Sequence, residues 1–229
     1  MKTRNEDLAA ERTQLAQVGR DLHARGWVPA TAGNLSVRNP DGTVWITASG
    51  THKGHLGFDD FVHVDLEGTV LPSTPPHRKP SAETSLHLAV YRTQPEAAAC
   101  LHVHTVASTL VHRTRSIGAQ ETKSLVGQPD GRVFPLRLPS LELIKAFGIW
   151  DEKPAEDVWV FPNLPRVADI AALVETAFAS RPSRVPGFLI ADHGLTTWGP
   201  DLTRTGYVLE AFDFLFRCML EARAAHLPD

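Results

Sequence analysis

The amino-acid sequence predicts an α/β protein of three layers, α/β/α, in which helices cover both faces of a central mixed, mainly antiparallel sheet. Segments with helical and strand-like apolar spacing alternate along the chain, which favours the α/β class. Tight turns join the early strands, and such turns connect antiparallel neighbours. The sequence also lacks the glycine-rich dinucleotide and phosphate-loop motifs of common parallel-sheet folds. A purely parallel sheet is therefore not expected.

The N-terminal part is expected to form one helix followed by two hairpins. Apolar residues recur at helical spacing over residues 5–25, and a glycine ends that helix. The first hairpin spans 35–48 and turns at Gly42, because glycine tolerates the left-handed geometry of a tight turn. The second hairpin spans 61–71 and turns at a Glu-Gly pair.

The remaining elements follow a proline-rich loop at residues 72–80. Ser81 is expected to cap the helix that comes next. The expected helices are 82–92, one from about 107, 141–147, 168–179 and 203–225, and the expected strands are 97–103, 159–161, 188–191 and 196–198. Residues 114–135 are expected to form a long loop.

Length and composition are those of one globular domain spanning residues 1–229. The hydrophobic fraction is 42% and the charged fraction is 21%, which are ordinary values for a folded chain. The formal net charge of -3 gives no basic footprint, so neither nucleic acid nor an anionic membrane is an expected partner.

Cysteine use and the N-terminal sequence favour a cytoplasmic protein. Cys100 and Cys218 cannot build a disulfide framework and are interpreted as small core residues. The charged N-terminal sequence contains no apolar targeting segment. No stretch approaches the roughly 20 apolar residues that a membrane-spanning helix needs.

The sequence contains 11 histidines, and the most informative pair is His102 and His104 at the end of an apolar strand. Residues i and i+2 of a strand point to the same side, so both imidazoles can reach one ion. Zinc accepts imidazole nitrogen and commonly has three protein ligands at a catalytic site. The same spacing also occurs in polar strand residues that only face solvent, and this alternative stays open.

His193 follows a second short apolar strand, where it could supply a third ligand. The segment Asp192-His193-Gly194 indicates a polar turn between two strands. A histidine that serves only the turn would give the same pattern. The His-x-His pair favours the ligand interpretation, because three imidazoles complete a catalytic zinc site.

Glu83 lies in the first turn of the helix that Ser81 is expected to cap. The helix dipole alone favours a carboxylate there, which is the simpler interpretation. The functional alternative is a carboxylate beside the metal, acting as an acid/base or as a further ligand. A carboxylate suits proton transfer at this place if burial raises its pKa toward neutrality.

Polar turns supply candidate ligands for a phosphate group. They include Asn34, Ser49, Gly50 and Ser81, and Lys53 could add a positive charge. Backbone amides at turns and at a helix N-terminus, with hydroxyl groups nearby, suit an anion. Each segment is ordinary turn chemistry by itself, so the prediction needs a fold that brings the segments together.

Five motifs, in this order, resemble the class II aldolase family, which includes sugar-phosphate aldolases, epimerases and the adducin head domain. The motifs are TAGNLSVR, ITASGTHKG, KPSAETSLHLAVY, LHVHT and ADHGLTTWG, and they span roughly residues 10–220. The resemblance implies an α/β/α fold and a homotetramer with sites near the subunit interfaces. It also implies one zinc ion per subunit on the three histidines, a sugar phosphate as substrate, and a phosphate pocket built from the turns named above.

Within the family, the segments LPSLELIKAFGIWDE at 138–152, VPGFLIADHGLTTWG and LEAFDFLFRCMLEA resemble a dehydratase branch. This resemblance implies zinc-dependent dehydration of a methylthio-substituted pentulose phosphate in methionine salvage. Glu142 matches the glutamate proposed as acid/base in such dehydratases, and Glu83 matches the catalytic glutamate of the aldolases. We favour Glu142 over Glu83 as the base, although Glu142 could also be a solvated residue on a short helix.

Two other functions stay open at this point. A class II aldolase or a pentulose-phosphate 4-epimerase would use the same metal and the same enediolate chemistry, although the segment 138–152 argues against both. A non-catalytic scaffold like the adducin head would not need a working metal site. The presence of all three histidines and of Glu83 disfavours the scaffold.

Overall fold

A computed structural model of the chain describes residues 4–114, 133–181 and 183–226. The loop expected over 114–135 therefore lies almost entirely outside the described residues. Within them, eight strands form one sheet in the order β3-β2-β1-β4-β8-β7-β6-β5. The strands are β1 (Asn34–Arg38), β2 (Val44–Thr47), β3 (Phe61–Val64), β4 (Ala99–Val103), β5 (Phe134–Arg137), β6 (Asp157–Phe161), β7 (Gly187–Ile190) and β8 (Gly194–Gly199).

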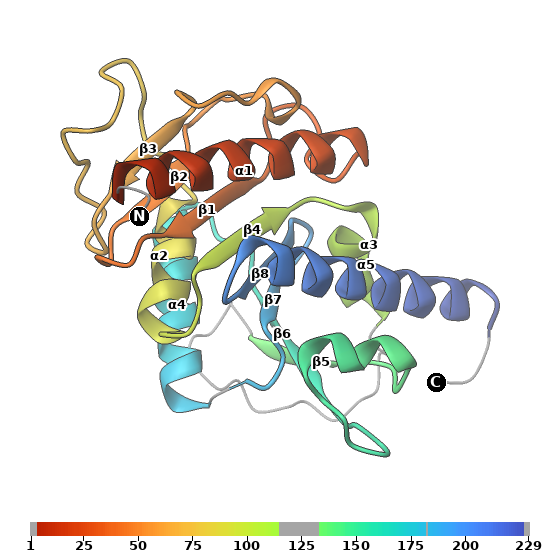
Figure 1. The fold of residues 1–229 in the computed structure, drawn as a ribbon. Coiled ribbons are helices and arrows are strands. Elements are labelled where there is room, and N and C mark those ends of the chain that lie inside the picture. Colours follow the sequence, from red (N-terminus) through yellow and green to blue (C-terminus); the bar gives the residue numbers. More distant parts are fainter. Residues whose placement is uncertain (1–3, 115–132, 182, 227–229) are drawn as a thin grey trace.

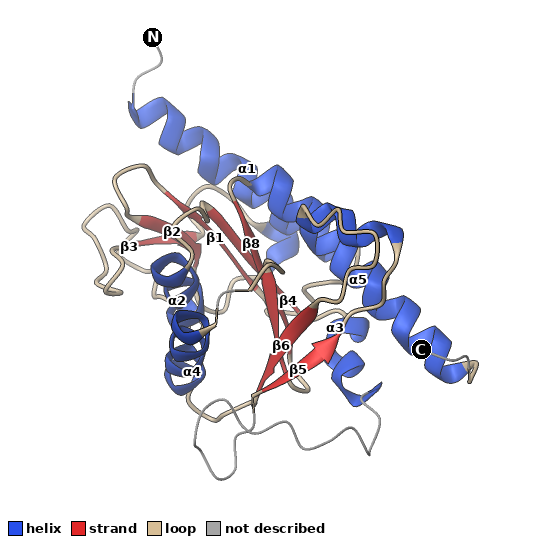
Figure 2. Ribbon diagram, turned by 90° about the horizontal axis from the view of Figure 1, so that it is seen from below, coloured by secondary structure: helices blue, strands red, loops and turns tan. Residues whose placement is uncertain are grey.

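Helices cover both faces of this sheet (Figure 1). They are the α-helices α1 (Arg4–Ala24), α2 (Thr84–Thr93), α3 (Val106–Leu110), α4 (Val167–Ser180) and α5 (Leu202–Ala224), and the 3-10 helices η1 (Lys53–His55), η2 (Val111–Thr114) and η3 (Glu142–Phe147). Figure 2 shows α2 and α4 on one face and α1, α3 and α5 on the other. None of the described helices combines the length and the apolar character needed to cross a bilayer.

Neighbouring strands are antiparallel except β6 and β7, which are parallel. The sheet is therefore mixed and mainly antiparallel, with a helical layer on each side. This arrangement confirms the three-layer α/β/α class predicted from the alternating patterns and the tight turns.

Alternate residues of the strands enter two separate apolar clusters, one on each face of the sheet. On β2, Val44 and Ile46 pack in the cluster under α2 and α4, whereas Trp45 packs in the cluster under α1 and α5. On β4, Cys100 and Leu101 divide in the same way. This division follows from the two-residue period of strand side chains. Because both faces are covered, a polar side chain on a central strand needs a hydrogen-bond partner.

The second expected hairpin is smaller than its sequence pattern indicates. β3 pairs with β2, and its last residue, Val64, forms only an isolated bridge with Val70. The carboxylate of Asp65 accepts hydrogen bonds from the backbone N–H groups of Glu67 and Thr69. An aspartate that binds nearby backbone donors favours a compact turn over a longer strand ladder.

Strand β5 is not predicted by the sequence and lies at the edge of the sheet beside β6. Its second residue is Pro135, which lacks a backbone donor and interrupts the strand pattern. An edge strand tolerates proline because one of its sides has no partner strand. The short helix expected at 141–147 is present as the 3-10 helix η3.

Candidate metal centre and phosphate pocket

Four side chains that could hold a metal ion converge at one end of the central strands. They are Glu83, His102, His104 and His193, and their ligand atoms all lie within 4.8 Å of one another. The histidines come from the end of β4 and from the turn between β7 and β8. The glutamate is the N-cap of α2, so the expectation that Ser81 caps this helix is wrong; Ser81 Oγ instead accepts from the backbone N–H of Glu83. The structure thus brings the three predicted histidines together, with Glu83 beside them.

The register of the sheet aligns polar residues that support this cluster. Asn34 lies opposite His102, and His102 lies opposite Thr196, so three neighbouring strands present these side chains in one row. Directly opposed residues share a face of the sheet. His102 is fully buried, and its Nδ1 lies 2.9 Å from the hydroxyl oxygen of Thr196.

A close approach of two chain segments places His193 at the end of β4. A Cβ atom added at Gly194 would lie 2.1 Å from the carbonyl oxygen of Val103, so a glycine is required there. Asp192 has a positive φ of 56°, and its carboxylate accepts a hydrogen bond of 2.8 Å from Arg113. Both features shape the turn that carries His193.

The Nδ1 atoms of His102 and His193 contact supporting side chains, and their Nε2 atoms face the centre of the cluster. His193 Nδ1 lies 3.4 Å from Asn163 Oδ1, and its Nε2 lies 3.1 Å from Glu83 Oε1. The Thr196 hydroxyl can accept from His102 Nδ1. The Nε2 atoms of His102 and His104 lie 3.0 Å apart. Zinc at its usual bond lengths holds two ligand nitrogens about 3.3 Å apart, which is close to this separation.

Burial keeps two of the histidines in the neutral form that binds metals. Removal from water lowers the pKa of His102 to about 4, although the negative charge of Glu83 opposes this shift. Burial likewise lowers the pKa of His104 to about 3, and the neighbouring histidines add to the effect. A metal ligand must offer an unprotonated nitrogen. Near pH 7 both imidazoles are therefore in the ligand form.

Glu83 is held in its ionised form by its neighbours. Burial by itself would raise the pKa of this carboxyl group, but His102, His193 and Asn34 outweigh burial and lower the pKa below its usual range. Its Oε1 lies 3.1 Å from His193 Nε2 and 3.6 Å from His102 Nε2. Its Oε2 accepts a hydrogen bond from the Asn34 amide. The shift is opposite to the raised pKa expected of a proton shuttle, so Glu83 can accept a proton but starts without one.

The residues predicted to bind phosphate line one cavity of about 300 Å³, and Glu83 lies in the same wall. All five of them contribute to it: Asn34, Ser49, Gly50, Lys53 and Ser81. Gly33 and Gly50 have positive φ values of 76° and 71°, which turn the backbone around the cavity. The Asn34 amide donates to Ser81 Oγ at 3.2 Å and so ties two of the turns together.

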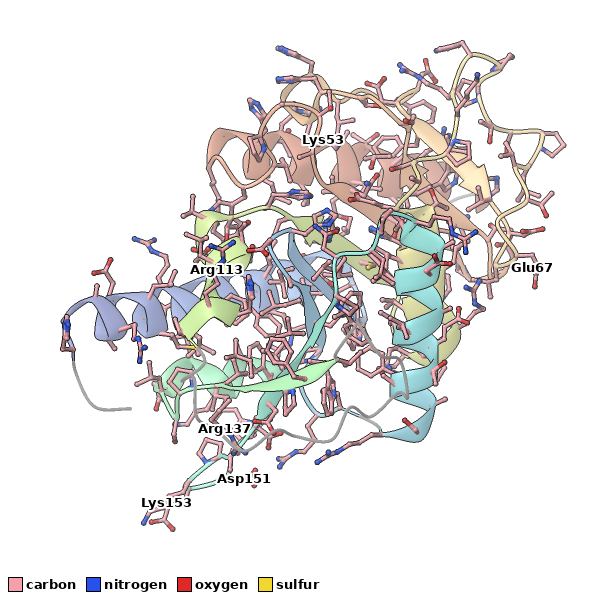
Figure 3. The ribbon with its side chains drawn as sticks, turned by 180° about the vertical axis from the view of Figure 1, so that it is seen from behind. Lys53, Glu67, Arg113, Arg137, Asp151 and Lys153 are labelled. Atoms are coloured by element: carbon pink, nitrogen blue, oxygen red, sulfur yellow. The ribbon has the colours of Figure 1, made fainter. Side chains whose placement is uncertain are left out.

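Lys53 supplies a positive charge to the wall of this cavity, although the residue is only 1% exposed. Its ammonium group donates to the backbone carbonyls of Thr31 and Thr51 at 2.6 and 3.0 Å. Burial lowers the pKa of Lys53 to about 8, and the carboxylate of Glu83 opposes this shift. Figure 3 shows Lys53 in the N-terminal part of the molecule, at the opposite end from Lys153.

Glu142 lies outside this cavity. It is the first residue of η3, its side chain is 78% exposed, and it pairs with Lys145 at 2.7 Å. The cavity wall and the metal cluster, as far as the structure describes them, do not include it. The fold of this chain therefore does not bring Glu142 to the site, and its role as acid/base stays a prediction.

Two supporting residues are not predicted by the sequence. Thr196 contacts Nδ1 of His102, and Asn163 contacts Nδ1 of His193. Thr196 stands in the motif ADHGLTTWG, but its contact with His102 depends on the register between β4 and β8. Asn163 lies between β6 and α4, and its contact arises from the pairing of distant strands, which local sequence does not reveal.

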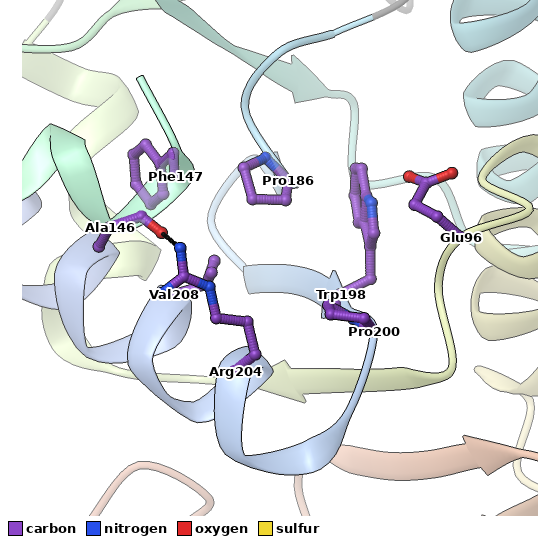
Figure 4. A pocket seen from close by; sticks show the side chains of 9 residues that line it. Glu96, Ala146, Phe147, Pro186, Trp198, Pro200, Arg204 and Val208 are labelled. Carbon is purple, nitrogen blue, oxygen red and sulfur yellow. Dashed lines mark hydrogen bonds between the residues drawn. The ribbon is translucent and has the colours of Figure 1, made fainter. Parts of the chain in front are cut away.

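A smaller cavity of about 160 Å³ lies at the other end of β4 and β8 (Figure 4). Trp198 in its wall pairs with Cys100 near the start of β4, whereas the histidines are at the end of that strand. Phe147 adds an apolar wall, and Arg204 donates to the carbonyl oxygen of Ala146 at 3.0 Å. This cavity is therefore separate from the metal centre.

The fold and the clustered histidines define the class of this protein. The family model of the class II aldolase and adducin N-terminal domain matches residues 13–220. The chain belongs to this family, which confirms the resemblance seen in its sequence motifs.

Two curated relatives of this chain carry the name of the same enzyme. A methylthioribulose-1-phosphate dehydratase from Microcystis aeruginosa is 40% identical over 211 residues, which cover 92% of this chain and 95% of the relative. A protein of the same name from Leptospira biflexa is 41% identical over 218 residues, which cover 93% of this chain and 98% of the relative.

Solved structures have the same fold. A putative aldolase/epimerase/decarboxylase from Escherichia coli superposes with a TM-score of 0.72 at 23% identity, covering 93% of this chain and 90% of that one. The L-fuculose-1-phosphate aldolase from Thermus thermophilus superposes with a TM-score of 0.67 at 26% identity, covering 96% and 97%. The predicted class II aldolase fold is thus confirmed.

Proposed function

We propose that this chain is a hydro-lyase that converts 5-methylthioribulose 1-phosphate to 2,3-diketo-5-methylthiopentyl 1-phosphate in methionine salvage. The observation that carries the proposal is that Glu83 belongs both to the metal cluster and to the wall of the phosphate cavity. A sugar phosphate anchored by its phosphate group therefore has its carbonyl and hydroxyl groups beside the cluster. The names of curated relatives that align with more than nine-tenths of the chain support the same reaction.

We infer that the metal is zinc, one ion per subunit, bound by His102, His104 and His193. Three imidazole nitrogens are a common ligand set of catalytic zinc and leave a position open for substrate. Zinc bound there supplies a Lewis acid that stabilises negative charge on the substrate oxygens. Manganese, iron and cobalt accept similar nitrogen ligands, so metal analysis of the purified protein is the test.

The turns of the cavity would hold the phosphate on carbon 1 of the substrate. Ser49 and Ser81 offer hydroxyl donors, and the amide of Asn34 holds Ser81 in place in the cavity wall. Gly50 has no side chain, so a phosphate can come close to its backbone. Lys53 adds positive charge from the wall. Fixing the phosphate fixes the position of the sugar chain in the cavity, so that carbon 3 comes near Glu83.

We assign to Glu83 the removal of the proton from carbon 3, because this carboxylate lies both at the metal cluster and in the wall of the phosphate cavity. The protonated Glu83 can then give this proton to the hydroxyl group on carbon 4, which departs as water. An enol between carbons 3 and 4 remains. It becomes the 2,3-diketone when the carbon-3 hydroxyl loses its proton and carbon 4 gains one, so the net change is the loss of one water molecule.

We retain Glu142 as an alternative acid/base that acts between subunits. In the proposed homotetramer, an exposed Glu142 could reach the metal cluster of a neighbouring copy. Mixing the variants His102→Ala and Glu142→Gln tests this role. His102→Ala subunits keep Glu142, and Glu142→Gln subunits keep the metal ligands. Activity that reappears in mixed tetramers supports it, whereas full activity of Glu142→Gln alone removes it.

A class II aldolase or a pentulose-phosphate 4-epimerase is the alternative enzyme, because the Thermus thermophilus aldolase is 26% identical to this chain. The same cluster and cavity would serve carbon–carbon bond cleavage. Parallel assays of dehydration on methylthioribulose 1-phosphate and of retro-aldol cleavage on fuculose and rhamnulose phosphates distinguish the two. A scaffold like adducin needs no metal, so purified protein without bound metal would favour that third function.

A further inference from the structure

Helix α2 and strand β1 face each other through polar side chains at regular spacing. Glu83, His87 and Tyr91 recur every four residues and so share one face of the helix. β1 presents Asn34 and Ser36, alternate residues that share one face of the strand. Asn34 donates to the carboxylate of Glu83, and Ser36 contacts both His87 and Tyr91. Figure 2 shows α2 lying over this face of the sheet.

The contacts of Ser36 are short and buried. Its Oγ lies 2.7 Å from His87 Nδ1 and 2.7 Å from the Tyr91 hydroxyl oxygen. Ser36 and His87 are 0% exposed, and Tyr91 is 2% exposed. Burial lowers the pKa of His87 to about 4, so its ring is neutral near pH 7. A neutral imidazole has one donor and one acceptor, so each hydrogen bond between Tyr91, Ser36 and His87 has a defined donor and acceptor.

One arrangement of protons leaves the fewest polar groups unpaired. The Tyr91 hydroxyl donates to Ser36, Ser36 donates to His87 Nδ1, and His87 carries its proton on Nε2. The reverse direction would leave the Tyr91 proton and the Nε2 lone pair without partners. In the part of the chain that the structure describes, His87 Nε2 has no hydrogen-bond partner. A buried polar group without a partner costs free energy, and an apolar side chain at this position would not carry that cost.

We propose that His87 is a positioning residue of the dehydration, because its bond to Ser36 holds α2 where Glu83 meets the metal cluster. This inference rests on the proposed function. Apolar residues such as Leu86 press α2 onto the sheet, but their contacts have no preferred direction. The hydrogen bonds to Ser36 are directional and set the height and rotation of the helix. A displacement of about 1 Å at a reacting group can cost roughly 100-fold in rate.

Two substitutions at His87 separate positioning from packing. His87→Leu keeps an apolar side chain but removes the bond to Ser36, whereas His87→Asn places an amide near the position of Nδ1 and can restore that bond. For His87→Leu we expect kcat to fall roughly 10- to 100-fold and KM to change less than about threefold, because the phosphate cavity is untouched. His87→Asn should recover most of kcat.

Val90→Ala is the matched control for packing. Val90 is fully buried on the same helix but takes no part in the polar contacts with β1. Its truncation should lower the melting temperature through a small cavity and leave kcat at the wild-type value. A fall in kcat for Val90→Ala as large as that for His87→Leu would mean that any loosening of α2 has this effect, and would overturn the specific role of His87.

A double variant tests whether His87 acts through Glu83. His87→Leu combined with Glu83→Gln should be no slower than Glu83→Gln alone, because the position of a missing carboxylate no longer matters. The visible spectrum of the cobalt-loaded protein gives a second readout that needs no turnover. The cobalt bands of His87→Leu should shift toward those of Glu83→Gln, and His87→Asn should match the wild type.

Three results would each overturn the proposal. The first is a double variant in which the two losses multiply. The others are equal kcat values for the leucine and asparagine variants, and a wild-type cobalt spectrum for His87→Leu. Failure of the proposed function is a different result, in which the wild type loads metal but does not dehydrate the substrate. The cobalt spectra still decide in that case whether His87 positions Glu83.

Discussion

His102 combines two functions that are usually separate, since it is a fully buried strand residue and a candidate metal ligand. Its Nδ1 faces the Thr196 hydroxyl, and its Nε2 faces His104. The contact with Thr196 holds the ring in an orientation that points Nε2 into the cluster. An imidazole held in this way binds a metal with little further ordering.

Thr196→Val should weaken zinc binding, because valine keeps the shape of threonine but cannot accept a proton from His102 Nδ1. Loss of such an outer partner lowers metal affinity roughly 10- to 100-fold. Competition with a chromogenic chelator measures the zinc Kd. Thr197→Val is the control, because Thr197 is equally buried but its hydroxyl donates to the carbonyl oxygen of Pro186. Equal zinc affinities for the two variants would contradict the orienting role of Thr196.

Lys53 should give the enzyme an alkaline limit. Its pKa is lowered to about 8 by burial, so its positive charge is lost as the pH rises through that value and phosphate binding weakens. We expect kcat/KM to fall above about pH 8 in the wild type and this fall to be absent in Lys53→Met, which starts from a lower value.

Unfolding at the titration of Lys53 does not explain such a fall. The folded chain releases this proton near pH 8 and the unfolded chain near 10.5, so a rise in pH between these values favours the folded state. Circular dichroism across the same range is the control. An unchanged alkaline fall in Lys53→Met would show that another group causes it.

At the residue scale, local spacing was a good guide to the site. His102 and His104 share a side because they are two apart on a strand, and such a relation is visible in the sequence. The orienting role of Thr196 was not visible, because it depends on the register between β4 and β8. The ionised state of Glu83 was not predictable either, since it results from neighbours on three other elements.

At the scale of elements, the site depends on how closely β4 approaches the turn before β8. A Cβ at Gly194 would come within 2.1 Å of the Val103 carbonyl oxygen and 3.5 Å of the His104 Cα. The two segments that carry the histidines therefore touch at this glycine. Any side chain there must push them apart, and the ligands move with them.

Gly194→Ala should destabilise the fold and weaken zinc binding together. Overpacking of this kind costs about 1–3 kcal/mol, measured as the change in the free energy of unfolding in urea. Gly206→Ala is the control: an added Cβ meets no atom within 4 Å in helix α5, so stability should stay equal or rise by about 0.5–1 kcal/mol. Wild-type stability and zinc affinity in Gly194→Ala would contradict the tight approach.

Elements were predicted well where apolar periodicity was strong and poorly where a single residue broke it. The long terminal helices and the strand before the His-x-His pair follow from spacing alone. β5 was missed because Pro135 interrupts its pattern, and the second hairpin was overextended because the side chain of Asp65 binds the backbone donors of the turn. Both errors arise from one residue that competes with regular hydrogen bonding.

At the scale of the whole molecule, segments distant in the chain form one continuous site. The turns near Asn34, Ser49 and Ser81 reach the same cavity wall as Glu83, and the histidines adjoin it. The sequence motifs predicted these parts, but their contact needed the fold. Glu142 is exposed and pairs with Lys145, away from this site.

The most direct measurement is a dehydration assay on methylthioribulose 1-phosphate, with the wild type and His102→Ala compared at known metal content. We predict that the zinc-loaded wild type forms the 2,3-diketone, and that His102→Ala binds little zinc and forms none. No diketone from a folded, zinc-loaded wild type would contradict the dehydratase function. Wild-type activity in a metal-free His102→Ala would contradict the part assigned to the metal centre.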